Sequence, residues 1–180
     1  ASRALLTALR VWPDAVAATP VETMQVHGDQ DGLVTFSAAE QGCAALTWIV
    51  DVPALEARLA DAIAYQPLVD MLEVPEPAAL TIICEGRASV GRDALAVEFN
   101  VRRYPHHAIA ARLRCDQPHG QTARQWFSKG DAGSEIMAFL PMGGVQGNLI
   151  AIVWSVPEVR AQTLMALEPP AFAAAVQAAG

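Results

Sequence analysis

The stretch His107-Ala-Ile-Ala-Ala-Arg-Leu-Arg-Cys115 decides the fold class. Its residues alternate in character, which is the period of two that a β-strand produces. One side carries Ile109, Ala111, Leu113 and Cys115, and the other carries Ala110, Arg112 and Arg114. A strand with one apolar and one basic side belongs to a sheet that is covered on one face only.

Segments on both sides of this strand extend the predicted sheet. Towards the C-terminus we expect strands at residues 122–127, 135–140 and 148–154, with the glycine-rich run 143–147 as a hairpin loop. Towards the N-terminus we expect a hairpin and one further strand, at residues 22–27, 33–37 and 44–50. The apolar run 79–84 has the length and composition of a buried strand.

Helices are expected outside this group of strands. The spacing of apolar residues predicts helices at residues 2–12 and 88–95. Proline positions predict two more helices, one that begins at Asp51 and Pro53 and one that begins at Pro169. Ser155 and Glu158 have the spacing of a capping box before another helix. Strands that cluster together, with helices segregated from them, predict an α+β fold. The sheet is expected to be largely antiparallel or mixed, with helices covering one face.

Composition excludes several classes of function. A net charge of −7 argues against nucleic-acid binding, which needs a basic face. With 53% hydrophobic residues, disorder is excluded, and no apolar run reaches the roughly 20 residues of a membrane span. The three cysteines form no C-x-x-C pair and suggest buried thiols in a reducing compartment. We therefore expect a cytoplasmic protein, with peripheral contact at the inner membrane left open.

Common catalytic and metal-binding templates are missing from the sequence. There is no G-x-x-x-x-G-K-[ST], H-E-x-x-H or G-x-S-x-G motif. His106 and His107 are adjacent, so in a strand they face opposite sides and cannot chelate one ion together. No catalytic acid–base residue and no metal ligand is predicted. One histidine that hydrogen-bonds a phenolic substrate remains an alternative to ordinary surface histidines.

The most informative motif is Ile82-Ile-Cys-Glu85-Gly86-Arg-Ala-Ser89-Val-Gly-Arg92. An acid that follows an apolar run can accept hydrogen bonds from ligand hydroxyls, and a glycine lets a ligand approach the backbone closely. A helix that begins directly afterwards favours a phosphate. The alternative is an ordinary turn into a helix, with Ser89 or Glu85 as the cap.

This motif resembles the acid–glycine element of flavin-dependent aromatic hydroxylases, in which Asp-Gly is followed by x-x-Ser and then Arg. Gly86, Ser89 and Arg92 match the element, and Glu85 replaces the aspartate. The resemblance implies that these four residues lie beside the flavin pyrophosphate and ribityl chain and are involved in the use of NAD(P)H.

Other segments occur in the order of the same family. They are residues 2–12, which end in Val-Trp, then 22–36, 46–50, Tyr104, 118–119, 125–127, 138–142 and 153–154. The subgroup that the chain resembles is that of the ubiquinone-biosynthesis hydroxylases, within the p-hydroxybenzoate hydroxylase-like flavin monooxygenases. Two positions depart from the family pattern: Arg10 stands where glycine is usual, and Tyr104-Pro-His106 stands where Tyr-Gly-Gln is usual.

The resemblance also implies a domain organisation. Residues 1–180 are expected to form one substrate-binding domain, in which residues 53–95 are a remnant of the crossover through the flavin domain. The N-terminal FAD-binding unit and the C-terminal segment of the family are expected to be absent, so that this chain alone binds no flavin. A face that the missing flavin-binding domain would cover is expected to be apolar, and copies of the chain are expected to associate through it.

The function implied is that of the substrate-binding domain of an FAD-dependent monooxygenase, which uses NAD(P)H to hydroxylate a polyprenylated phenol. In such enzymes the flavin supplies the oxygen chemistry, while the protein binds, orients and excludes water. The residues predicted to line the substrate pocket are Trp48, His107, Phe139 and Pro141, each of which could instead belong to the core or a strand end. Two alternatives remain open: a non-catalytic α+β module that binds a lipid or quinone-like ligand, and a purely structural interaction domain.

Overall fold

The computed structural model describes residues 2–130, 133–143 and 146–180 of the 180-residue chain. It divides into two compact units. The main unit contains residues 1–65 and 105–180, and the smaller unit contains residues 66–104. The smaller unit overlaps the expected crossover 53–95 at residues 66–95, and residues 53–64 form part of a helix of the main unit.

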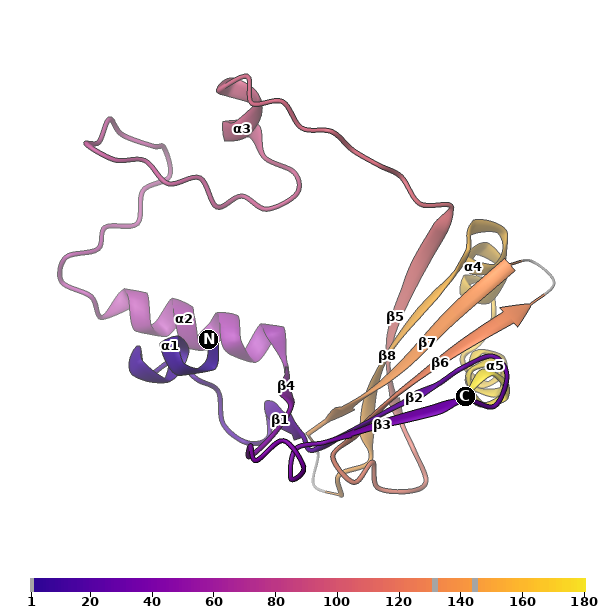
Figure 1. Cartoon of the computed structure of the whole chain (residues 1–180). Coiled ribbons are helices and arrows are strands. Elements are labelled where there is room, and N and C mark those ends of the chain that lie inside the picture. Colours follow the sequence, from indigo (N-terminus) through magenta and orange to yellow (C-terminus); the bar gives the residue numbers. More distant parts are fainter. Residues whose placement is uncertain (1, 131–132, 144–145) are drawn as a thin grey trace. The chain divides into compact units, whose positions relative to one another are not determined.

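A six-stranded sheet forms the centre of the main unit (Figure 1). Its strands, in spatial order, are β3 (Leu33–Ser37), β2 (Thr23–His27), β6 (Thr122–Gly130), β7 (Gly133–Met142), β8 (Leu149–Pro157) and β5 (His106–Arg114). All neighbours are antiparallel except β2 and β6, which pair in parallel. The predicted mixed α+β sheet and the hairpin around residues 28–32 are therefore confirmed.

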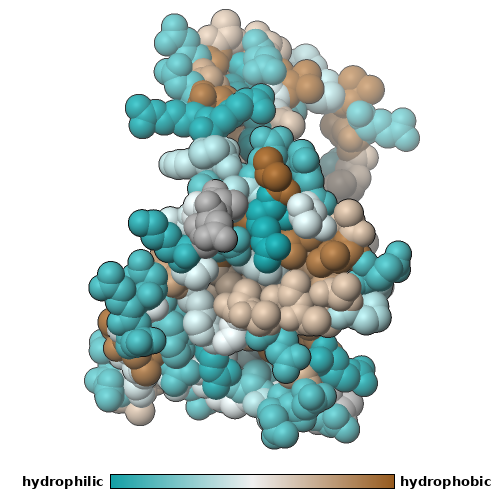
Figure 2. Space-filling view, turned by 90° about the vertical axis from the view of Figure 1, so that its right-hand side faces the viewer, coloured by the Kyte–Doolittle hydropathy of each residue, from teal (hydrophilic) through white to brown (hydrophobic). Residues whose placement is uncertain are grey.

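Two C-terminal helices, α4 (Glu158–Met165) and α5 (Pro169–Ala179), cover one face of this sheet (Figure 1). The period of two in β8 places Ile150, Ile152, Trp154 and Val156 on that face, where all four are buried. From the helices, Leu164 and Val176 complete the core. Burial of each large apolar side chain contributes about 1.5–3 kcal/mol, so this layer supplies much of the stability of the unit. Figure 2 shows this side of the molecule, with hydrophilic and hydrophobic residues mixed over its surface.

A second, two-stranded sheet joins β1 (Ala18–Val21) and β4 (Thr47–Val50) in antiparallel pairing. The sequence pattern did not predict β1, because Pro20 within it removes a backbone donor and argues against a strand. As an edge strand with a single partner, β1 tolerates this proline.

Two helices flank this sheet in the sequence, α1 (Ser2–Ala8) and α2 (Val52–Ala64). As predicted, Asp51 begins α2, and its carboxylate accepts a hydrogen bond from the Ala54 amide at 3.4 Å.

The smaller unit contains one short helix, α3 (Val90–Ala94), and no strand among its described residues. The predicted buried strand at residues 79–84 is wrong, since this run is not in a strand and Leu80 and Ile82 are 76% and 74% exposed. A strand needs a neighbour for its backbone amides and carbonyls. The apolar composition of this run could not reveal that the fold offers none.

Three smaller expectations also change. Ser155 does not cap a helix: β8 continues through it, and Pro157 occupies the position before α4 without a side-chain hydrogen bond. The predicted loop at residues 143–147 lies partly outside the described residues. Of the predicted buried thiols, Cys43 and Cys84 are exposed and Cys115 is half-buried.

In the described part of the chain, no helix combines the length and the apolar character that crossing a bilayer demands.

Candidate functional site

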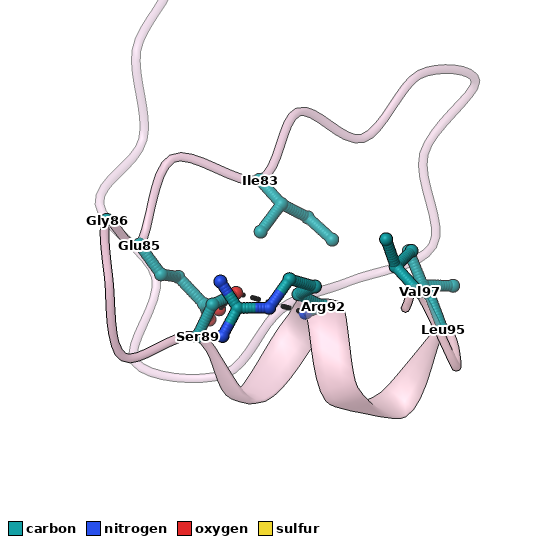
Figure 3. A pocket seen from close by; sticks show the side chains of 7 residues that line it. All are labelled: Ile83, Glu85, Gly86, Ser89, Arg92, Leu95 and Val97. Atoms are coloured by element: carbon teal, nitrogen blue, oxygen red, sulfur yellow. Dashed lines mark hydrogen bonds between the residues drawn. The ribbon is translucent and has the colours of Figure 1, made fainter. Parts of the chain in front are cut away.

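Three of the four predicted cofactor-binding residues form one hydrogen-bonded cluster at the start of α3 (Figure 3). The Glu85 carboxylate accepts a hydrogen bond from the Ser89 hydroxyl at 2.6 Å and one from the Gly91 amide at 2.8 Å. The Ser89 oxygen in turn accepts from the Arg92 amide at 3.0 Å, which makes it the N-cap of α3. These contacts with Ser89 and Gly91 hold the Glu85 carboxylate in place.

These contacts fix the charge of the cluster. The hydrogen bond from the Ser89 hydroxyl, followed by that from the Gly91 amide, lowers the pKa of Glu85 below its usual value, and the nearby Arg92 charge acts in the same direction. The carboxylate is therefore ionised at neutral pH. It can accept hydrogen bonds from a ligand, and it cannot serve as a proton donor there.

The side chain of Arg92 brings a further donor to the cluster. Its Nη2 donates to the Arg87 carbonyl at 3.1 Å, and its guanidinium lies 4.0 Å from the centre of the Phe99 ring. Its Nε is buried without a hydrogen-bond acceptor among the described residues, with an Asp93 carboxylate oxygen 3.7 Å away. A buried N–H group without an acceptor is costly, so this donor is suited to an oxygen atom of a ligand.

A cavity of about 290 Å³ adjoins the cluster (Figure 3). It is lined by Ile83, Glu85, Gly86, Ser89, Arg92, Leu95 and Val97. Gly86 has a φ of +72°, a conformation that glycine adopts without strain, and a Cβ there would meet no atom within 4 Å. All four residues predicted from the motif thus line one cavity. An anionic carboxylate for hydroxyls and an arginine N–H for a phosphate oxygen fit part of a dinucleotide, and the volume is too small for a whole one.

The four predicted substrate residues, in contrast, lie in different parts of the main unit. Trp48 lies in the two-stranded sheet, where its ring meets Trp12 edge-on at 6.3 Å and the Arg3 guanidinium covers it at 4.0 Å. His107 is exposed near the start of β5. Phe139 and Pro141 lie on β7, where Pro141 is fully buried and Phe139 contacts the helix-covered core. Their role in substrate binding stays a prediction.

The face of the large sheet opposite α4 and α5 has features that the sequence reading did not single out. Phe127 pairs with Ile136 across β6 and β7, and Val153 lies on the same face of β8. These three side chains are 41%, 36% and 39% exposed. We call them, with Ala110 and Ala138 of the same face, the open sheet face. The signal was available in β7 and β8, where residues between the buried ones, such as Ala138 and Val153, are also apolar.

No protein-family model matches the chain. Solved structures, in contrast, resemble it over most of its length. PqsL, described as a probable FAD-dependent monooxygenase from Pseudomonas aeruginosa, superimposes with a TM-score of 0.69 at 17% sequence identity, covering 91% of this chain and 49% of PqsL. The structure of P. aeruginosa PqsL in complex with 2-aminobenzoylacetate gives a TM-score of 0.69 at 17% identity and covers 91% of this chain and 48% of that one.

Both superpositions extend over nearly the whole chain, although the chain spans only about half the length of the proteins it matches. At this level of identity the likeness concerns the fold. This chain therefore has the fold of about half of PqsL.

Proposed function

We propose that this chain is the substrate-binding part of an FAD-dependent monooxygenase that hydroxylates an aromatic ring. The observation that carries the proposal is the superposition on PqsL over 91% of the chain. The Glu85 cluster supports it, since it offers an ionised carboxylate and an unused arginine donor at the position that the resemblance predicts for flavin contacts.

The bound flavin would supply dioxygen activation, with NAD(P)H as reductant, and the residues of this chain would supply position and environment. Arg92 would donate from Nε to a phosphate oxygen, and the Glu85 carboxylate would accept from ribityl or ribose hydroxyls. The apolar side chains of the open sheet face would pack over the ring of the substrate and exclude water. No acid–base residue of this chain is needed for these tasks.

For the substrate class we propose a polyprenylated phenol of ubiquinone biosynthesis, in a cytoplasmic enzyme. The order of family motifs favours this subgroup, and an apolar open sheet face suits a prenylated ring. The same face is the surface on which we propose that a flavin-binding domain docks. Copies of the isolated chain would associate through it for the same physical reason.

The first test is a visible absorption spectrum of the 180-residue chain after gel filtration with added FAD. The proposal predicts that no stoichiometric flavin band co-elutes, because the Glu85 cavity accommodates only part of the cofactor. Stoichiometric flavin in the protein peak would contradict the proposed division of roles.

Binding of a short prenylated phenol, 2-geranylphenol, tests the substrate face. Tryptophan fluorescence should report binding to the wild type and weaker binding to Val153→Glu, which places a charge on the open sheet face. Val159→Glu is the matched control, because Val159 is exposed on α4. Equal binding by both variants and the wild type would contradict this location and favour a lipid- or quinone-binding module that uses another surface.

A further inference from the structure

A second cavity, of about 360 Å³, lies in the main unit at the margin of the core. It is on the helix-covered side of the sheet, since Trp126 and Phe139 in its wall pack against the core cluster. Its lining comes from the segment between β5 and β6, from three neighbouring strands and from Gly180. The lining residues that matter here are Cys115, His119, Arg124, Trp126, Phe139 and Ile150.

One wall of this cavity is aromatic and held in place from two sides. The Trp126 ring stacks on His27 at 5.3 Å with an angle of 10° between the planes. Phe139 meets the same indole edge-on at 4.8 Å. Rings fixed by neighbours on adjacent strands lose little freedom when a flat ligand packs on them, and this favours binding of another aromatic ring.

The polar side of the cavity carries the positive charge of Arg124. Arg124 is partly buried, and its Nε donates to the Gln25 side chain at 3.1 Å. In the part of the chain that the structure describes, no carboxylate lies within ion-pair distance of Arg124. A cation that is partly withdrawn from water and has only a neutral partner favours an anion.

Two further titratable side chains, His119 and Cys115, line the cavity beside Arg124. His119 Nδ1 accepts from the Gln121 amide at 3.0 Å, which leaves Nε2 to donate to the Met142 carbonyl at 2.8 Å. Burial raises the pKa of the Cys115 thiol, an effect that Asp116 reinforces and Arg124 opposes. The thiol therefore lies within reach of the Arg124 charge.

We propose that this cavity binds a small aromatic carboxylate, with the ring against Trp126 and Phe139 and the carboxylate on Arg124. The volume lies within the range of about 300–1,000 Å³ that small-molecule sites occupy. The site is distinct from the Glu85 cluster, with which it shares no residue, and from the open sheet face on the opposite side of the sheet. The proposal does not depend on flavin binding.

Calorimetry with two probes of the same shape tests the proposal on the full chain. The wild type should bind 2-naphthoate at least about tenfold more tightly than uncharged 2-naphthylmethanol, as expected for a charge-assisted pair. Arg124→Gln should remove most of this preference. Arg114→Gln is the control, because Arg114 is exposed on the other face of β5, and it should keep the preference. Equal affinity of the wild type for the two probes overturns the proposal.

Alkylation of Cys115 gives an independent measurement of location. In a Cys43→Ser, Cys84→Ser background, 2-naphthoate should slow the reaction of Cys115 with iodoacetamide, and 2-naphthylmethanol should slow it less. Unchanged labelling at saturating naphthoate overturns the proposed site. If Arg124→Gln does not fold, Arg124→Lys keeps the charge without the planar fork and should retain an intermediate preference.

Discussion

The indole nitrogen of Trp154 in β8 donates a hydrogen bond to the Glu135 carboxylate in β7 at 3.1 Å. Trp154 is 1% exposed, and the second Glu135 oxygen lies 3.5 Å from Arg160 on α4. The Arg160 guanidinium also lies 5.6 Å from the Trp154 ring. One carboxylate thus links two strands of the sheet to the helix that covers them.

Replacement of Glu135 should therefore lower stability more than a surface change would. Glu135→Ala leaves the buried Trp154 N–H without an acceptor, which costs about 1–3 kcal/mol. Glu135→Gln keeps an acceptor and should cost less. Urea denaturation of the two variants measures the difference, and equal midpoints would show that the indole hydrogen bond contributes nothing.

Gly143 lies against the segment that precedes the two-stranded sheet. A Cβ added at Gly143 would collide with the carbonyl group of Val16, and backbone atoms cannot move aside cheaply. Gly143→Ala should therefore cost about 1–3 kcal/mol in the free energy of unfolding. Gly32→Ala is the control, because a Cβ there meets nothing within 4 Å. Thermal melts in which both variants match the wild type would contradict this close approach.

The Glu85 cluster should depend on pH in one direction. Since the Ser89 and Gly91 hydrogen bonds lower the pKa of Glu85 in the folded chain, they stabilise the turn fully above the unfolded pKa. That contribution is lost as the pH falls through the lower, folded pKa. The Gly91 amide signal in NMR should titrate with a midpoint below that of an ordinary glutamate, and Glu85→Gln should abolish the step. A midpoint at or above the ordinary value would exclude the hydrogen bonds.

Asp51 combines two roles that substitution can separate. It caps α2 through the Ala54 amide, and its other oxygen accepts from Arg112 at 2.8 Å. The arginine is 59% exposed, so the ion pair contributes little, whereas loss of an N-cap costs about 0.5–2 kcal/mol. Asp51→Ala should therefore destabilise clearly more than Arg112→Ala in denaturant melts. The reverse order would mean that the ion pair, and not the cap, holds the start of α2.

The open sheet face predicts a concentration-dependent association. Sedimentation of the wild-type chain should show larger species at high concentration, and Val153→Glu should reduce them because a charge opposes burial of this face. The same substitution at exposed Val159 on α4 should leave association unchanged. A wild type that stays monomeric at every concentration would contradict the proposed docking role of this face.

The alternation of apolar and polar residues in strands and the residue types at helix N-caps predicted much of the fold, because both depend only on residues that are close in the sequence. The pattern from His107 to Cys115 gave the correct faces of β5, and Asp51 marked the start of α2. The apolar run at residues 79–84 led to a wrong strand prediction. A strand forms only beside a neighbouring strand, and the local sequence does not encode whether one is present. The four residues of the Glu85 motif, which the family resemblance singled out, line one cavity because they lie close together in the sequence.

The predicted substrate residues show the limit of the same reasoning. Trp48 and Phe139 are aromatic residues in strands, and their types do not reveal on which sheet or which face they lie. Arg124 and Trp126 were missed as partners of Phe139 because their proximity depends on the register between β6 and β7.

The parallel pairing of β2 with β6 determines how the chain can fold. Gln25 and Arg124, neighbours across this pair, are 99 positions apart, so β2 can pair with β6 only after more than two thirds of the 180 residues have been made. Contacts of such high sequence separation slow folding, and the loop entropy must be lost before the contacts form. Until then, the β2–β3 hairpin lacks its neighbour β6, and Leu33, Val34 and Phe36 of its edge strand are exposed even in the folded chain. Extended apolar segments that are exposed during synthesis in this way are the kind of segment that chaperones bind.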